Sequence, residues 1–182
     1  MMTNYVFLAD GFEEIEALTT IDIMRRAGMD VTTVSINPEL TVTGAHNVTI
    51  IADELITDID FNEADWLILP GGMPGASNLR ACEPLCNALL RHDAEGKRIA
   101  AICASPTIIL ATLGLLNGKD ATCYPSMENY DYNVNWNDDM VVTAGNIVTG
   151  RGPAAASEFA LTIVTKTCGA NVADEVAAGM LL

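Results

Sequence analysis

Residues 98–110, RIAAICASPTIIL, decide the expected fold. The stretch opens on a continuous apolar run, which is typical of a strand buried on both faces of a sheet. From Ser105 it becomes helix-forming, with Pro106 in the first turn, where proline is favoured. Cys103 lies where the strand pattern stops. We therefore expect a tight strand-to-helix turn that projects this thiol from the end of the strand.

The alternation of strand and helix continues on both sides of this stretch. Strands are predicted at 4–9, 30–36, 65–70 and 98–103, helices at 12–28, 84–96, 105–114 and 152–169, a short helix at the C-terminal end, and hairpins at 40–52 and 140–150. The first helix is expected to be capped by Asp10 with Glu13, the first hairpin to be appended to the main sheet, and 71–78 to be a turn. The pattern predicts an α/β sandwich of three layers, with helices on both faces of a mostly parallel sheet. With no repeat or linker, residues 1–182 are predicted to be a single domain.

Composition narrows the classes of function. The 24 acidic and 9 basic side chains give a formal net charge of −15, which would repel a nucleic-acid backbone. The sequence has no apolar run of bilayer-spanning length and no signal-peptide pattern at its start, so we expect a cytoplasmic protein without membrane contacts. The five cysteines are expected to be free thiols. Neither His46 nor His92 has ligand-like spacing to Cys82 and Cys86, so no metal site is expected.

In parallel sheets, ligands bind at the carboxyl ends of the strands, near the switch in strand order. That rule selects the loops 10–16, 70–75 and 103–106. The helix start after Cys103 would favour its thiolate, although a small buried hydrophobe is the common fate of a free cysteine. The glycine pair Gly71 and Gly72 follows a buried strand and offers N–H groups to an oxyanion, or is simply a turn.

Three carboxylates lie in the first of these loops. Glu13 and Glu14 suit the first helical turn as solvated charges that complement the helix dipole. Glu16 lies closer to the expected apolar face. A partly dry carboxyl group beside a thiolate tends to stay protonated and to donate a hydrogen bond to sulfur. The alternative, an exposed glutamate, stays open on these residues alone.

Together these segments resemble the ThiJ/PfpI superfamily and, within it, the DJ-one branch. The resemblance rests on five motifs in order along nearly the whole chain: FEEIEA with Glu16, DIMRRAG at 22–28, LPGGMPGASNL at 69–79, AAICASPTIIL at 100–110 and RGPAAASEFAL at 151–161. It implies a flavodoxin-like sandwich, Cys103 as the nucleophile and Glu16 as its hydrogen-bonding carboxyl partner. It also implies an anion pocket formed by the N–H groups of Gly72 and Ala104, and a homodimer with the first helix and the hairpin near His46 at the interface.

The resemblance implies two classes of function. Members of the branch are associated with glutathione-independent glyoxalase and deglycase chemistry on small dicarbonyls, which requires no metal or organic cofactor. The rival is a redox sensor or chaperone-like stress protein that acts through oxidation of Cys103. Both hypotheses depend on the sulfur of Cys103, and they differ in whether the protein uses it to convert a substrate.

One residue departs from the branch. A histidine before a proline commonly follows the nucleophile by about twenty residues, and here Tyr124 precedes Pro125. A phenol is a poor base at neutral pH, although it can donate a hydrogen bond. A peptidase triad therefore lacks a candidate base. Tyr124 could line a pocket mouth or pack on the surface, and Arg151 could orient the loop facing the site or neutralise neighbouring groups.

Overall fold

The computed structural model describes residues 2–182, which form a central sheet with helices on both faces. Its strand order is β10-β11-β7-β6-β1-β2-β5, and all neighbours are parallel except β10 and β11. The strands are β1 (Thr3–Leu8), β2 (Val31–Ser35), β5 (Glu54–Leu55), β6 (Ala64–Leu69), β7 (Arg98–Ile102), β10 (Val141–Ala144) and β11 (Ile147–Gly150). The chain order reverses between β1 and β6, so the loops after β1, β6 and β7 meet at the switch point.

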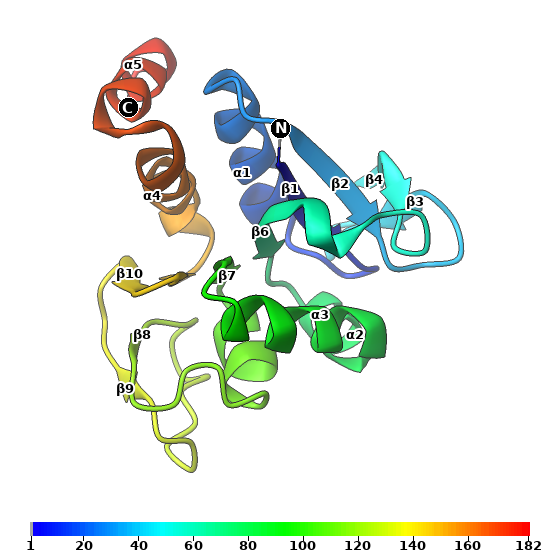
Figure 1. Ribbon diagram of the computed structural model, residues 1–182, viewed down its shortest axis with the longest axis vertical. Coiled ribbons are helices and arrows are strands. Elements are labelled where there is room, and N and C mark those ends of the chain that lie inside the picture. The colour runs from blue at the N-terminus through cyan, green and yellow to red at the C-terminus, as the bar shows by residue number, and fades with distance from the viewer. Residues whose placement is uncertain (1) are drawn as a thin grey trace.

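Two helical layers enclose the sheet (Figure 1). One consists of α1 (Glu14–Arg26), α4 (Ala156–Cys168) and α5 (Ala170–Met180), and the other of α2 (Gly75–Ala81), α3 (Glu83–Ala94) and η2 (Pro106–Ala111). Short 3-10 turns precede β6 and α4: η1 (Phe61–Glu63) and η3 (Pro153–Ala155). The flavodoxin-like three-layer fold predicted from the sequence is confirmed.

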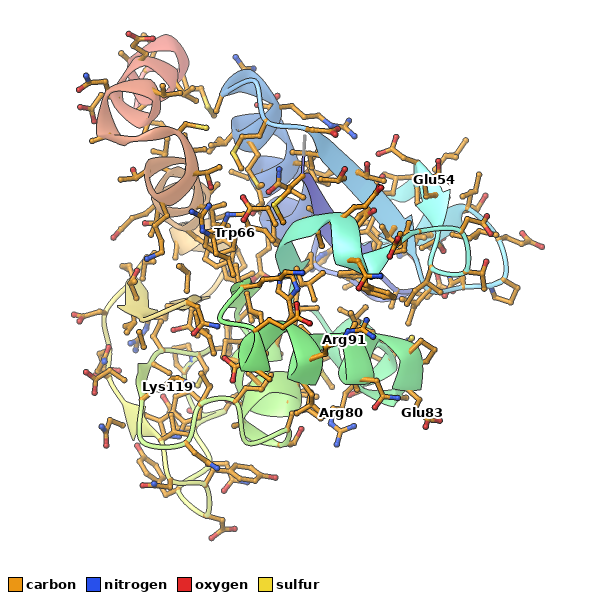
Figure 2. The ribbon with its side chains drawn as sticks, viewed as in Figure 1. Glu54, Trp66, Arg80, Glu83, Arg91 and Lys119 are labelled. Carbon is orange, nitrogen blue, oxygen red and sulfur yellow. The ribbon has the colours of Figure 1, made fainter. Side chains whose placement is uncertain are left out.

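Strand β6 shows how the sequence separates the two core layers. Successive side chains of a strand point to opposite faces. Trp66 and Ile68 accordingly pack in the core beneath α1 and α4, whereas Leu67 and Leu69 pack in the core beneath α3 and η2. The indole nitrogen of Trp66 donates a hydrogen bond to Thr167 Oγ1 of α4 at 2.9 Å, so this large side chain is buried with its polar atom satisfied. Figure 2 labels Trp66 among the side chains next to α4.

The hairpin at 40–52 forms, but it does not join the main sheet. Strands β3 (Thr41–Thr43) and β4 (Thr49–Ile51) pair only with one another among the described residues. The edge of the main sheet is taken by β5, which the sequence pattern did not indicate. The prediction of an appended hairpin is therefore wrong. The physical reason is that backbone and side-chain hydrogen bonds hold the hairpin against the loop after β1 and the start of α1.

Three local predictions also need correction. Residues 75–78 of the expected turn belong to the helix α2. The helix expected from Ser105 is the π-helical segment η2, followed by a hydrogen bond from Leu115 N to Leu110 O that spans five residues. The cap of α1 is Glu13 alone, whose carboxylate accepts from the N–H of Glu16 at 2.7 Å.

The polar stretch at 120–137, which had no assignment from sequence, contains the two short strands β8 (Asp120–Ala121) and β9 (Asn135–Trp136). Within residues 2–182, none of the helices is long and apolar enough to cross a bilayer.

Candidate active site

Cys103 follows β7 directly and has left-handed backbone geometry, with φ of 66°. This conformation is uncommon for a residue with a side chain and persists only where the surroundings hold it. Here both backbone groups are fixed. The Cys103 N–H donates to Gly150 O at 2.9 Å, and the Cys103 carbonyl accepts from Tyr124 N at 2.8 Å. The strand-to-helix elbow expected from the sequence is present, and the loop after β8 and the last residue of β11 hold it.

Glu16 reaches this elbow from the first turn of α1 and is completely buried. Its Oε2 atom accepts from the N–H of Gly71 at 2.8 Å. Oε1 has no hydrogen-bond partner, and the thiol of Cys103 is the neighbouring acidic group that affects the pKa of this carboxyl group. The sequence left a solvent-exposed Glu16 open, and the buried position excludes that alternative.

Gly71 fits between the two side chains because it has no Cβ atom. A Cβ at this position would lie 2.6 Å from Cys103 Cβ and 2.7 Å from Glu16 Oε2. Gly72 has φ of 89° and packs against the backbone at the start of α1. The glycine pair is therefore more than a turn, since close approach of the thiol and carboxyl groups requires it.

Burial changes the proton affinities of both acids. Burial raises the pKa of Glu16 to about 7, against the lowering effect of hydrogen bonds from Cys103 and Gly71. Burial and the Glu16 carboxylate raise the pKa of the Cys103 thiol above its ordinary value, while the N–H groups of Gly72 and Ala104 lower it. The two acids share one dry space, so the pair accommodates one negative charge far more readily than two.

These observations correct one expectation. The helix start and its N–H groups predict a thiol of lowered pKa. The two N–H donors do lie beside the sulfur, but burial and Glu16 outweigh them, and Cys103 is only 7% exposed. The ionisation of this thiol is therefore governed by the proton of Glu16 rather than by the helix start alone.

Tyr124 and Arg151 lie together in a separate pocket of about 230 Å³ beside the elbow. Its lining comprises Tyr124, Pro125, Met140, Arg151, Gly152, Pro153, Ala154 and Ala155. The guanidinium of Arg151 donates to Asp138 Oδ1 at 2.7 Å, so its positive charge is paired with an exposed carboxylate. Tyr124 is about half exposed.

The sequence pattern predicted that Glu13 and Glu14 are solvated charges, but both side chains are buried. The role of Glu14 was also missed. Glu14 accepts from the backbone N–H of His46 at 2.6 Å and pairs with His46 Nδ1 at 2.7 Å. This contact joins the β3–β4 hairpin to α1. Gly44 is the residue in the sequence that could have indicated this contact, because a Cβ there would collide with the Glu14 carboxylate.

Glu13, Glu14 and His46 place a ligand atom each within 4.8 Å of one another, a spacing open to a metal ion. The hydrogen bonds already made by the Glu14 carboxylate account for this cluster without an ion. Cys82 and Cys86 are free thiols, and Cys86 bonds with the backbone carbonyl of Arg80 instead.

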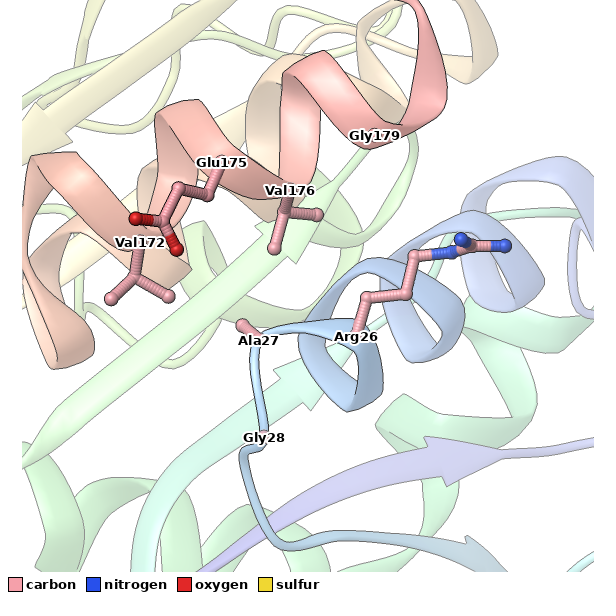
Figure 3. A pocket seen from close by; sticks show the side chains of 7 residues that line it. All are labelled: Arg26, Ala27, Gly28, Val172, Glu175, Val176 and Gly179. Atoms are coloured by element: carbon pink, nitrogen blue, oxygen red, sulfur yellow. The ribbon is translucent and has the colours of Figure 1, made fainter.

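A second hollow of about 510 Å³ lies between the end of α1 and α5, lined by Arg26, Ala27, Gly28, Val172, Glu175, Val176 and Gly179 (Figure 3). Arg26 is ten residues after Glu16, which corresponds to about 15 Å along the helix axis. This hollow is therefore at the opposite end of α1 from the thiol–carboxyl pair.

Comparison with known proteins shows the family to which the chain belongs. Residues 2–166 match the DJ-1/PfpI family. The chain belongs to the DJ-1/PfpI family. It is 39% identical over 176 residues to "Protein DJ-1 homolog B" of Arabidopsis thaliana, covering 96% of this chain and 40% of that protein. The chain thus spans less than half the length of that family member.

Two further family members bear on structure and chemistry. The solved structure "Toxoplasma gondii DJ-1, oxidized" superimposes with a TM-score of 0.92 at 38% identity, over 100% of this chain and 98% of that one. "Glutathione-independent glyoxalase DJR-1.2" of Caenorhabditis elegans is 34% identical over 154 residues, which cover 84% of this chain and 81% of that protein. The family and its flavodoxin-like fold are therefore established for this chain.

Proposed function

We propose that this protein is a cysteine-dependent stress-protection enzyme that acts on reactive dicarbonyls, with glutathione-independent glyoxalase or deglycase-type chemistry at Cys103. The observation that carries the proposal is the buried carboxyl group of Glu16, with a pKa raised to about 7, beside that thiol. A group that gains and loses a proton near neutral pH suits general acid–base catalysis. The similarity to the nematode glyoxalase supports the same chemistry.

The reactive form carries its single negative charge on sulfur, and it arises when the Cys103 thiol transfers its proton to the Glu16 carboxylate, which is the more acidic of the two groups. The N–H groups of Gly72 and Ala104 stabilise the thiolate, and Glu16 keeps its proton. Oε1, which lacks a nitrogen or oxygen partner, is the atom suited to carry that proton toward sulfur. In this form the buried site avoids a second charge, which would be costly in a dry environment.

The reaction begins when the thiolate adds to the aldehyde carbon of a dicarbonyl such as methylglyoxal. A carbon–sulfur bond forms, the carbonyl π bond breaks, and the oxyanion is stabilised by the N–H groups of Gly72 and Ala104. Protonation by Glu16 gives a hemithioacetal. Glu16 then moves the proton of the former aldehyde carbon to the neighbouring carbon, and the proton of the hemithioacetal hydroxyl passes to the oxygen of the neighbouring carbonyl. The first carbon is thereby oxidised to a thioester and the second is reduced to an alcohol. Water hydrolyses the resulting thioester to a hydroxy acid such as lactate, so the sum of the steps is the addition of one water molecule.

The direct test is consumption of methylglyoxal without glutathione by the wild type and by Cys103→Ser. We expect the serine variant to lose nearly all activity, and Cys168→Ser, which changes an exposed thiol, to retain it. Equal rates for the wild type and Cys103→Ser would refute the enzyme proposal.

The second candidate function is a redox sensor or chaperone-like protein with little turnover. A protonated Glu16 would donate a hydrogen bond to an oxidised sulfur, and the similar protein from Toxoplasma gondii has been solved in an oxidised form. After mild peroxide treatment, intact mass and peptide mapping should show two added oxygen atoms on Cys103. Oxidation spread over all five cysteines would argue against sensing.

We also propose a homodimer formed through α1 and the β3–β4 hairpin. Ile15, Leu18 and Ile51 are exposed on these elements, with Ile51 at 76%, and burying such side chains favours association. Light scattering should show a dimer that Ile51→Lys weakens. The five free cysteines suit a reducing compartment such as the cytoplasm. Peptidase activity stays disfavoured, because His46 pairs with Glu14 and His92 is buried against Asp65 O.

A further inference from the structure

We propose that the pocket formed by Tyr124, Met140 and residues 151–155 binds the substituent of the carbonyl substrate and favours flat aryl groups over methyl. This inference rests on the proposed function and adds a substrate class to it: aryl-substituted α-oxoaldehydes. The pocket holds about 230 Å³, which is room for a phenyl ring and more than a methyl group requires. The specificity residue is Tyr124.

The pocket is joined to the elbow through both backbone groups of Cys103. The loop bearing Tyr124 donates its N–H to the Cys103 carbonyl at 2.8 Å, and Gly150, which precedes Arg151, accepts the Cys103 N–H at 2.9 Å. The two walls of the pocket thus begin one hydrogen bond from the nucleophilic residue. The proposal places the substituent of a substrate attached to the sulfur against these walls.

The lining is apolar where it would meet a substituent. Pro125, Met140, Pro153 and the two alanines contribute carbon atoms, and the one charged lining residue, Arg151, is already paired with Asp138. An uncharged substituent therefore gains by burial, while a carboxylate on the substrate would have to compete with Asp138 for the guanidinium group.

The ring of Tyr124 lies against the backbone of Gly152. A Cβ at Gly152 would be 3.2 Å from Tyr124 Cδ2 and 3.7 Å from Cε2, so the absence of a side chain at this glycine allows the ring to pack closely against the backbone. The ring supplies an aromatic face to the pocket. Offset stacking of aromatic rings is worth about 0.5–1.5 kcal/mol beyond burial, which corresponds to about a two- to tenfold preference.

Turnover of phenylglyoxal and methylglyoxal provides the first measurement. We expect the ratio of their kcat/KM values to favour phenylglyoxal in the wild type and in Tyr124→Phe, and to fall about five- to tenfold in Tyr124→Leu. The matched control is Tyr130→Leu, since Tyr130 is 80% exposed in the same polar stretch. An unchanged ratio in Tyr124→Leu, or an equal fall in Tyr130→Leu, would overturn the proposal.

A second measurement does not depend on turnover. α-Bromoacetophenone and bromoacetone alkylate thiols at the same kind of carbon and differ in phenyl against methyl. Rates of labelling at Cys103, mapped by mass spectrometry and normalised to a small free thiol, should show the same preference and the same loss in Tyr124→Leu. If neither dicarbonyl is consumed but this labelling preference is present, the proposed enzyme function fails and the pocket assignment stands. If the labelling ratio is independent of Tyr124, the pocket assignment fails.

Discussion

Glu14 and Glu16 are two residues apart on α1 and both are buried, yet their surroundings have opposite effects on their charge. Burial would raise the pKa of Glu14, but hydrogen bonds from the side chain and backbone of His46 outweigh it and the pKa is lowered. Glu16 faces a thiol and one N–H group, and burial raises its pKa to about 7. Hydrogen-bond donors to the carboxylate, rather than burial alone, separate a structural carboxylate from one able to transfer protons.

A glycine adjoins each carboxyl group, Gly44 beside Glu14 and Gly71 beside Glu16. At Gly44, the close approach of the Glu14 carboxylate holds the β3–β4 hairpin against α1. At the elbow, it brings a carboxyl group to a thiol. The same local device, a missing Cβ, thus serves folding at one site and chemistry at the other.

The largest expected effect comes from removing the proton-transfer group while keeping its shape. Glu16→Gln should lower dicarbonyl turnover by about 100- to 1000-fold, because general acid–base catalysis contributes in this range. Alkylation of Cys103 should change by less than about tenfold, because the amide group can still donate a hydrogen bond to sulfur. Glu14→Gln is the matched control and should keep the turnover within about threefold while losing about 1–3 kcal/mol of unfolding free energy. Equal losses of turnover in both variants would remove the distinction between the two glutamates.

The second effect concerns stability as a function of pH. Since the folded-state pKa of Glu16 is above that of the unfolded chain, its contribution is fully present below about pH 4.5 and is lost as pH rises through about 7. The loss should approach about 3 kcal/mol at pH 8, because each pH unit between the unfolded-state and folded-state pKa values of Glu16 contributes about 1.4 kcal/mol. Denaturant unfolding of the wild type and Glu16→Gln at pH 5 and pH 8 measures it. The variant should lose less stability than the wild type over this range, and parallel pH profiles would contradict the assignment.

The two glycines sharpen the comparison further. Gly71→Ala and Gly44→Ala should each cost about 1–3 kcal/mol, because the added methyl group overpacks a filled space. Gly71→Ala should also lower the rate of Cys103 alkylation, since its Cβ meets both Cys103 and Glu16. Gly44→Ala should leave this rate unchanged when measured where both variants are fully folded. Loss of alkylation in Gly44→Ala would show that the hairpin and the elbow are coupled.

The smallest effect is expected at His46, whose ring is exposed. The hydrogen bond and charge of Glu14 raise the pKa of His46, so the ion pair stabilises the protein fully below about pH 6.5 and is lost as pH rises through the raised value. Glu14, with its lowered pKa, adds stability above about pH 4.5 that is lost in acid. The difference in thermal midpoint between the wild type and His46→Asn should therefore be greatest between these limits. A difference that grows toward pH 9 would contradict the pairing.

The elements built on long apolar runs could be predicted from sequence because their patterns are local. Strand β6 and the β7–Cys103 junction follow from continuous apolar residues, and the alternation with helices predicts the sandwich. Helix α2 was missed because the residues 71–78 are rich in glycine and small polar side chains, which are typical of turns. The predicted attachment of the β3–β4 hairpin to the main sheet was wrong because the position of the hairpin depends on contacts such as that of Glu14 with His46, which are 32 residues apart.

The sequence by itself determined where the thiol lies, at the end of a buried strand, and which segments contribute the neighbouring glycines and carboxyl groups. Only the tertiary structure decided the state of these groups. Burial and donors brought together from distant segments decide three properties. These are whether Glu16 is protonated near neutral pH, whether Glu14 holds the hairpin against α1, and whether Tyr124 lines a pocket. Local periodicity carries information about which face of an element is apolar, but a pKa and a pocket arise from packing between elements.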